Sequence, residues 1–377
     1  MIPLSVPNLT GNEKSLINNC LETGWVSTAG EYVVNFEKEF ASYHNQEDAL
    51  SLMNGTSALH ICLMLSGANL NNHVLTTNIT FVATLNSITY TGAEPILFDI
   101  DENNWQLDLD LLENFLNEEC DYKNGSTIYL KTKRPINSVM IVHNLGGVCD
   151  MHRLKSICEK FKLKLIEDAA ESLGSTFDNK LSGTFGDYSA FSFNGNKIIT
   201  TGGGGMILAK NKNDLEKARH LATTAKTDPK RYFHDNVGYN YRLVNILSAL
   251  GIAQLQNLDD FVSIKRKINN FYEENINQSV GPIFQKHEER CLSNCWLPTA
   301  RFKNSQSLMD NLERKGIQTR PVWTPMNQLP MYSGLEYIAN NDISKKVHDN
   351  AVSLPCSTNI THEELKIVSS SINNFYD

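Results

Sequence analysis

Lys197 has a sequence context that favours chemistry over simple solvation. It lies in SFNGNKIITTGGGGM (Ser192–Met206), after the buried-strand pattern YSAFSF and before four consecutive glycines, Gly202–Gly205. Most lysines are solvated surface charges, but a glycine run favours tight turns or a close approach of the backbone to a ligand. A desolvated lysine loses its proton more easily, and the neutral amine can form a Schiff base with a carbonyl group. The motif therefore indicates a covalently held carbonyl cofactor, for which pyridoxal phosphate (PLP) is the candidate.

Asp168 is the first residue that could act together with this lysine. It follows the apolar run Leu163–Ile166 in the segment IEDAAESLGS, and that run predicts a buried strand. Ligands of α/β sheets bind at the carboxyl ends of the strands. A carboxylate there could pair with the protonated pyridine nitrogen of PLP and make the ring a stronger electron acceptor. The alternative is an ordinary N-cap of a helix that begins at AAESL.

The junction NGTS (Asn54–Ser57) is the second candidate partner, because it joins a predicted strand to a predicted helix. Backbone N–H groups at a helix N-terminus, together with small hydroxyl side chains, form a natural phosphate site. Alone the signal is weak, since many helices begin this way as plain capping. The G-x-G-x-x-G pattern is absent here, and the later glycine run lacks the Lys-Ser/Thr ending of a P-loop. Binding of NAD or ATP is therefore disfavoured.

The elements that must position these residues alternate short apolar runs with amphipathic stretches from about residue 49 to 210. This rhythm is typical of an α/β domain whose strands are buried on both faces of a largely parallel sheet. The predicted strands are Ala49–Leu52, His73–Thr76, Ile96–Phe98, Ser138–Val142 and Leu163–Ile166. The predicted helices are Ala58–Leu65, Phe81–Tyr90 and a stripe from Leu154 to Phe161. The polar stretch between Cys120 and Ser138 contains Asn-Gly and is expected to form a hairpin-like insertion.

The pattern changes after about residue 258, where a second and smaller α+β unit is expected. Its predicted elements are a charged helix (Asp259–Glu274), a strand-like run (Trp296–Ala300), a helix (Ser305–Lys315), the run Ile317–Trp323 and a last helix (His362–Asn374). We therefore predict two domains, residues 1–257 and 258–377.

Composition excludes several classes of function. The 377 residues are 41% hydrophobic and 20% charged, as in ordinary soluble proteins, and the net charge of −8 argues against nucleic-acid binding. We see neither a signal peptide nor an apolar stretch long enough to span a bilayer. Of the eight cysteines, Cys291 and Cys295 are closest, but no second pair or histidine cluster completes a metal site. Reduced thiols, no metal and a cytoplasmic setting are expected.

The order of the motifs resembles the sugar-nucleotide aminotransferases of the DegT/DnrJ/EryC1/StrS family. The segments that carry the resemblance span nearly the whole chain: TGWVSTAGEYVVNFE (Thr23–Glu37), GTSALH (Gly55–His60), TFVATLNSITYTGAEPILFDID (Thr80–Asp101), EDAAESLGS (Glu167–Ser175), FSFNGNKIITTGGGG (Phe191–Gly205), GYNYRL (Gly238–Leu243) and IQTRPVW (Ile317–Trp323). They are most similar to the aminotransferases of the legionaminic acid and bacillosamine pathways. The resemblance implies PLP fold type I, with a mixed, mostly parallel seven-stranded sheet in the large domain and a smaller α+β C-terminal domain.

The resemblance also implies roles for single residues. Lys197 would carry PLP as the Schiff base and move the proton between Cα and C4′, while Asp168 would pair with the pyridine nitrogen. Phe81, otherwise an ordinary core aromatic, would stack on the ring. Asn240 would reach the phosphate in the partner subunit, because the family shares its sites across a homodimer. The phosphate would be held by Gly55, Thr56, Ser57 and Ser192.

One position departs from the commoner family pattern. Where many relatives have glutamine or histidine near the cofactor O3′, this chain has Glu171, which either donates a proton to O3′ or is held away from it. Sugar-nucleotide or donor contacts are expected from Trp25, Ser27, Arg320 and Trp323. Arg320 could equally be a surface residue.

The resemblance implies a two-stage transamination from L-glutamate to a nucleotide-linked keto sugar in bacterial surface glycan synthesis. The expected acceptor is C4 of a UDP-2-acetamido-4-keto-6-deoxy-hexose. A 3-keto sugar or a dTDP- or GDP-linked sugar is the alternative. A PLP-dependent dehydratase is disfavoured, because such relatives replace the lysine with histidine. An amino-acid lyase and a non-enzymatic sugar-binding module are the remaining alternatives.

Overall fold

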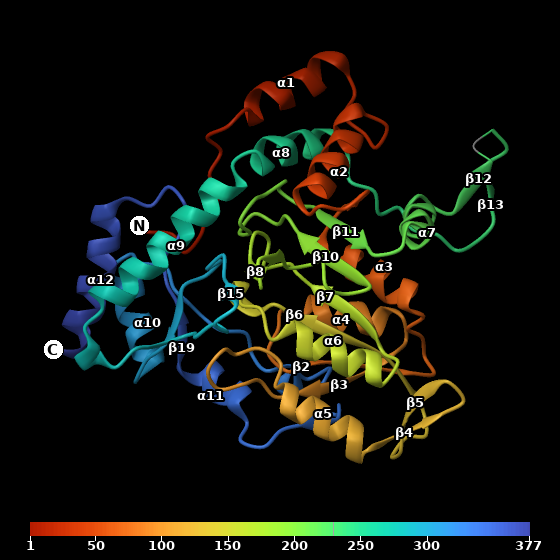
Figure 1. Cartoon of the computed structure of the whole chain (residues 1–377). Coiled ribbons are helices and arrows are strands. Elements are labelled where there is room, and N and C mark those ends of the chain that lie inside the picture. The colour runs from red at the N-terminus through yellow and green to blue at the C-terminus, as the bar shows by residue number, and fades with distance from the viewer. Residues whose placement is uncertain (229) are drawn as a thin grey trace.

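The computed structural model describes residues 1–228 and 230–377, and its centre is a mixed β-sheet (Figure 1). The strands lie in the order β1 (Leu50–Leu52), β11 (Gly205–Ala209), β10 (Tyr188–Ser192), β7 (Lys164–Asp168), β6 (Pro135–Val142), β2 (His73–Thr77) and β3 (Glu94–Phe98). β11 is antiparallel to both of its neighbours, whereas each strand from β10 to β3 is parallel to the next. The expected mixed, mostly parallel sheet is therefore confirmed, and these seven strands form its main part.

The sheet is larger than the sequence predicted, because three more strands join it to make ten. Two form the expected hairpin, β4 (Cys120–Lys123) and β5 (Ser126–Tyr129), which pairs with β6. At its turn Asn124 and Gly125 both have positive φ, of 52° and 83°, as a tight hairpin turn requires. The third is β18 (Tyr337–Ile338), which comes from the C-terminal part of the chain and pairs with β3.

Alternating strand residues face two separate helical layers, which explains the continuous apolar runs. Met140, Ile166 and Ala190 belong to a core with α3 (Gly55–Ser66), α4 (Ala83–Tyr90) and α7 (Lys212–Ala222). Val139, Ile141 and Leu165 belong to another core with α5 (Leu109–Glu118) and α6 (Met151–Lys160). On that face, the end of the sheet with β10 and β11 packs on α2 (Glu31–Tyr43) and α8 (Asn245–Leu255). α1 (Glu13–Thr23) packs on α8.

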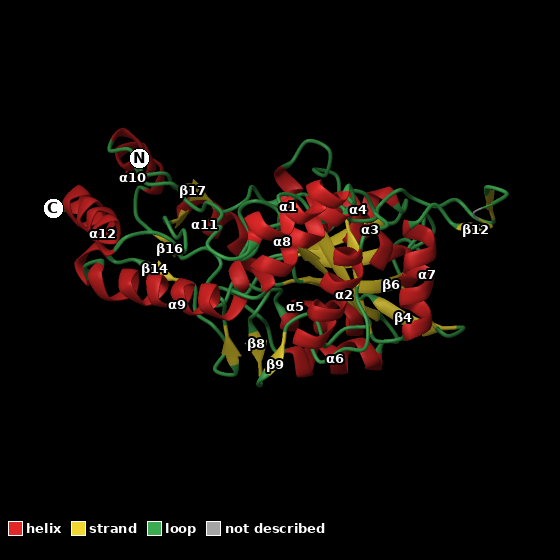
Figure 2. Cartoon of the chain, turned by 90° about the horizontal axis from the view of Figure 1, so that it is seen from above, coloured by secondary structure: helices red, strands yellow, loops and turns green. Residues whose placement is uncertain are grey.

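The C-terminal part forms a second layer at one end of the molecule (Figure 2). Its antiparallel sheet has the order β14 (Ile283–Phe284), β16 (Thr299–Arg301), β19 (Ala351–Ser353) and β17 (Arg320–Pro321). Three helices pack around it: α9 (Leu258–Asn275), α10 (Ser305–Arg314) and α12 (His362–Tyr376). The predicted helices of this part are confirmed, but the run from Ile317 to Trp323 contributes only two strand residues. α11 (Ile343–Asn350) follows β18.

The domain boundary at residues 257 and 258 stays a prediction. α9 begins there, but Ile2 packs in the core of the C-terminal layer and β18 returns to the central sheet. The remaining elements are short: β8 (Thr176–Phe177), β9 (Lys180–Leu181), β15 (Cys291–Leu292), β12 (Lys226–Asp228), β13 (Phe233–His234), and single 3₁₀ turns at Asn144–Gly146, Gln278–Val280 and Met326–Gln328. The β12–β13 hairpin projects from the body beside α7 (Figure 1). Among the described residues, no helix is both long and apolar enough to cross a membrane.

Candidate active site

Asp168 ends the strand β7 and lines a cavity of about 500 Å³ at the carboxyl edge of the sheet. Its Oδ2 accepts a hydrogen bond from Thr84 Oγ1 at 2.8 Å, and its Oδ1 accepts one from the Ala170 N–H at 3.2 Å. Burial raises the pKa of Asp168, and these two bonds oppose the rise. Because turns rather than a helix follow it, the alternative role as a helix N-cap is wrong. A buried carboxylate with few donors is suited to receive a cationic N–H.

Lys197 enters the same cavity from the loop between β10 and β11. Its Nζ lies 3.7 Å from Glu171 Oε1 and 4.0 Å from the ring centre of Trp296. The side chain is 12% exposed. Burial lowers the pKa of Lys197, although the carboxylates of Glu171 and Asp168 act in the opposite direction. Desolvation therefore favours the neutral amine, which is the form that attacks a carbonyl carbon.

Glu171 is buried beside this lysine, and its side chain is only 4% exposed. Its Oε2 accepts a hydrogen bond from the Leu145 N–H at 2.8 Å, which points Oε1 toward Lys197. Burial raises the pKa of Glu171 to about 7, and the nearby lysine only partly offsets the effect. A carboxylic acid with a pKa in this range can give or take a proton near neutral pH.

The N-terminus of α3 lies against the end of β10, where a phosphate would fit. The Asn54 side chain accepts a hydrogen bond from the Ser57 N–H at 2.7 Å and completes a capping box. In the part of the chain that the structure describes, the N–H groups of Gly55 and Thr56 meet no acceptor. A Cβ on Gly55 would lie 2.9 Å from Ser192 Cβ, so glycine is needed for this close approach. Free N–H groups at a helix N-terminus suit a phosphate.

These groups fit PLP, because the amine of Lys197, the carboxylate of Asp168 and the N-terminus of α3 all line one cavity. The predicted residues that line it are Gly55, Thr56, Phe81, Asp168, Glu171, Ser192, Lys197 and Trp323. Phe81 is 55% exposed at the cavity and is therefore free to cover a bound ring. Ser57 lies next to the cavity, but its hydroxyl and N–H are engaged in the capping box.

Besides Ser57, four predicted residues lie outside this cavity. Trp25 and Ser27 lie between α1 and α2, where their carbonyl groups accept hydrogen bonds from Asn245. Arg320 is exposed in β17 and donates to the Thr319 carbonyl. Asn240 is exposed in the segment that follows the β12–β13 hairpin. Its expected contact, the phosphate of a partner subunit, would require it to point away from its own cavity.

Trp296 and Thr84 line the cavity but were missed as site residues by sequence reasoning. Trp296 lies just before β16 and stacks on Trp323, with ring centres 6.3 Å apart and an angle of 10°. Its Nε1 donates a 2.7 Å hydrogen bond to the Asn196 carbonyl. No spacing in the sequence links this tryptophan to the lysine loop. Thr84 gave only a weak signal in the sequence, namely its spacing of one helical turn from Thr80. In the structure the hydroxyl groups of Thr80 and Thr84 form a hydrogen bond of 2.7 Å.

Among the described residues, no group of three or more histidine, cysteine or acidic side chains is arranged to hold a metal ion. The eight cysteines are all free thiols.

Comparisons with known proteins identify the family. The DegT/DnrJ/EryC1/StrS aminotransferase family model matches residues 7–373. GDP-perosamine synthase of Escherichia coli O157:H7 is 37% identical over 100% of this chain and 98% of its own. The Vibrio cholerae enzyme of the same name is 33% identical over 100% of both chains. Spr1654 of Streptococcus pneumoniae, solved in its PLP form, shares the fold with a TM-score of 0.87, 23% identity and coverage of 99% and 98%. The chain therefore belongs to the DegT/DnrJ/EryC1/StrS aminotransferase family of PLP-dependent enzymes.

Proposed function

We propose that this enzyme transfers an amino group from L-glutamate to a ketone of a nucleotide-linked sugar, at C4 of a 6-deoxyhexose. The observation that carries the proposal is the meeting of Lys197, Asp168 and the α3 N-terminus in one cavity. These three groups match the aldehyde, the pyridine nitrogen and the phosphate of PLP, and the family match supplies the reaction type.

The residues divide the work of a transamination. PLP supplies an aldehyde and an electron-accepting ring when it is bound. Lys197 would hold the aldehyde carbon of PLP, and its amine is placed in the cavity to hold or move a proton beside Glu171. Asp168 would hold the protonated pyridine nitrogen, because burial leaves its carboxylate poorly solvated without a cationic partner. Glu171 lies close enough to Lys197 to exchange a proton with it.

The nucleotide and the sugar are the finer part of the proposal. The motif resemblance favours a UDP-2-acetamido-4-keto-6-deoxy-hexose. Two relatives of 37% and 33% identity are named for a GDP-linked sugar, which supports guanosine diphosphate as an alternative carrier. A GDP-linked 4-keto-6-deoxyhexose is therefore the second candidate, and with either acceptor the product would serve bacterial surface glycan synthesis.

We also propose a homodimer with shared sites. Asn240 is exposed and stands apart from its own cavity, as a residue that reaches a partner's phosphate must be. Trp25 is 58% exposed, which is unusual for an isolated tryptophan but expected for one that contacts a sugar nucleotide or a second subunit. Ser27 and Arg320 remain proposed substrate contacts.

The test has two stages, because each half of the reaction can be followed alone. First, L-glutamate is added to the holoenzyme without acceptor, and loss of the cofactor's visible band with formation of 2-oxoglutarate is the expected result. Second, UDP-, GDP- and dTDP-linked 3-keto and 4-keto sugars are supplied, and the products are analysed by mass spectrometry and NMR. An amine at C4 supports the proposal. Loss of a hydroxyl without nitrogen gain would indicate a dehydratase, and no glutamate half-reaction would indicate a binding module.

A further inference from the structure

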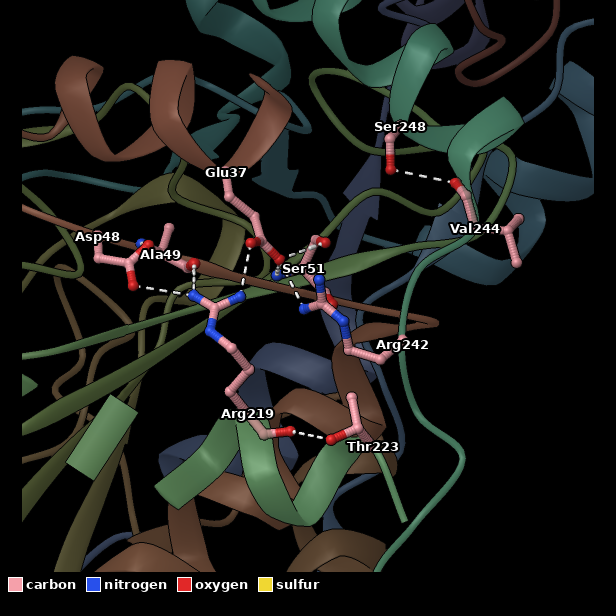
Figure 3. Close-up of polar contacts among 9 residues, drawn as sticks. All are labelled: Glu37, Asp48, Ala49, Ser51, Arg219, Thr223, Arg242, Val244 and Ser248. Atoms are coloured by element: carbon pink, nitrogen blue, oxygen red, sulfur yellow. Dashed lines mark hydrogen bonds and ion pairs between the residues drawn. The ribbon is translucent and has the colours of Figure 1, made fainter. Parts of the chain in front are cut away.

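Glu37 carries a buried carboxylate that the reaction itself does not use. The residue lies on α2 and is only 4% exposed. Its Oε1 accepts hydrogen bonds from Arg242 at 2.6 Å and from both the N–H and the hydroxyl of Ser51, at 2.7 and 2.8 Å (Figure 3). Its Oε2 accepts one from Arg219 at 2.7 Å. One carboxylate therefore joins three separate segments of the chain.

Two of these segments lead to the proposed phosphate site. Ser51 lies in β1, which runs into Asn54 and the N-terminus of α3. Arg242 follows Asn240 by two residues and forms an antiparallel bridge with Leu52, on the edge of β1 away from β11. The Met53 N–H also donates to the Tyr241 carbonyl at 2.7 Å. Glu37 thus ties the phosphate-binding junction of its own chain to the segment that carries Asn240.

The charge of the Glu37 carboxylate is balanced by two arginines, Arg219 and Arg242. Arg219 also donates to Asp48 at 2.9 Å and to the Ala49 carbonyl at 3.0 Å, which places two guanidinium groups among two carboxylates (Figure 3). Burial would raise the pKa of Glu37, but Arg242 and Arg219 outweigh it and lower the pKa below its ordinary value. Buried charge-assisted hydrogen bonds are stronger than neutral ones and fix geometry, since a change in either partner leaves the other unpaired.

We propose that Glu37 is a positioning residue for PLP binding, which holds residues 238–243 and the β1–α3 junction in the register that both phosphate contacts need. In a homodimer, each phosphate would be held by the α3 N-terminus of one subunit and by Asn240 of the partner subunit. Loss of the Glu37 anchor would loosen both contacts at once. The inference rests on the proposed roles of Gly55, Thr56 and Asn240.

A matched control is available in Asp99, another buried carboxylate that joins two elements. It is 1% exposed and accepts 2.7 Å hydrogen bonds from the Ile343 N–H and from the N–H and hydroxyl of Ser344. These bonds tie the end of β3 to α11, and Asp99 does not line the cavity. A carboxylate of similar burial therefore tests stability without touching the phosphate site.

The experiment compares Glu37→Gln and Asp99→Asn with the unchanged holoenzyme. The Kd for PLP is measured by equilibrium dialysis, and urea unfolding of each protein reports stability. We expect Glu37→Gln to raise the Kd roughly tenfold or more, and Asp99→Asn to leave it within about twofold despite a similar loss of stability. If Glu37→Gln folds poorly, Arg242→Lys serves as the second variant. It changes the same ion pair at the arginine and leaves the Glu37 carboxylate in place.

Two results would overturn the inference. One is a Kd for Glu37→Gln, or for Arg242→Lys, that equals that of the unchanged enzyme. The other is a weakening of PLP binding in both the Glu37 and the Asp99 variants in proportion to their lost stability. Failure of the proposed phosphate site is distinguishable, because the Kd would then be insensitive to substitution at Gly55 as well.

Discussion

Nζ of Lys197 lies over the indole ring of Trp296, 4.0 Å from its centre. The same indole donates its Nε1 hydrogen to the carbonyl of Asn196, the residue before the lysine, at 2.7 Å. Trp296 therefore contacts both the end of the lysine side chain and the backbone that carries it. Since the ring face attracts a cation, this contact would give the protonated lysine a defined position in the cavity.

Replacing Trp296 should separate these two contacts. Trp296→Phe keeps a ring face but loses the N–H donor, whereas Trp296→Leu loses both. We expect the rate of the glutamate half-reaction to fall roughly threefold in the first variant and about tenfold or more in the second. Stopped-flow absorbance measures both rates. Equal rates in all three proteins would show that the indole only fills space.

Asp168→Asn should slow the chemistry while leaving PLP bound. The amide has the shape of the carboxylate but no charge, so the pyridine nitrogen loses the partner that keeps it protonated. We expect the exchange of the glutamate α-proton with deuterated solvent to slow about a hundredfold or more. Thr84→Val, which removes only the 2.8 Å hydrogen bond to Asp168, should cause a smaller loss. A full-rate Asp168→Asn enzyme would contradict the assignment.

Glu171→Gln should change how stability depends on pH in the PLP-free protein. The folded pKa of Glu171 is about 7, raised from an ordinary 4.5, so the folded chain binds the extra proton between these values. The free energy of unfolding of the unchanged protein therefore falls as pH rises through that window. Glutamine has no such ionisation. As pH rises through the window, the variant therefore gains up to about 3 kcal/mol of stability relative to the unchanged protein.

Urea unfolding at about pH 5 and about pH 8 measures this difference, because the two conditions lie near the ends of the window. The comparison uses the same two proteins at both values, which cancels contributions from groups that do not interact with Glu171. If the stability gap between them does not change with pH, Glu171 titrates in its ordinary range and does not share a buried proton with Lys197.

Gly55→Ala should weaken PLP binding. The added Cβ would lie 2.9 Å from Ser192 Cβ and force the α3 N-terminus away from β10, which widens the proposed phosphate site. We expect the Kd for PLP to rise about tenfold. Gly334→Ala is the control, since a Cβ there meets nothing within 4 Å. The prediction fails if both variants bind PLP as tightly as the unchanged enzyme.

The site residues at the carboxyl ends of strands were predictable from the sequence. Asp168 and the NGTS junction each follow an apolar strand, and the carboxyl ends of parallel strands meet at one edge of a sheet. Lys197 was identified by its glycine-rich surroundings. Trp296 could not be found this way, because it reaches the cavity only through the packing of the C-terminal layer on the large sheet. That packing depends on long-range contacts that no local pattern encodes.

The same limit explains the sheet strands that were not predicted. β18 contains only Tyr337 and Ile338, and it pairs with β3 after a long loop, so it has no alternating pattern of its own. The β12–β13 hairpin is short and exposed, with Phe233 61% exposed. Short polar strands carry too few buried residues to produce a periodic signal.

Borohydride reduction of the holoenzyme, followed by peptide mapping, tests the central claim most directly. Reduction makes the bond between PLP and its lysine permanent, so mass spectrometry can locate it. We expect the added mass of the reduced cofactor on the peptide that contains Lys197 and on no peptide with another lysine. In Lys197→Ala, no peptide should carry this added mass. Recovery of the cofactor on a different lysine, or a Lys197→Ala enzyme that keeps both the visible band and multiple turnovers, would contradict it.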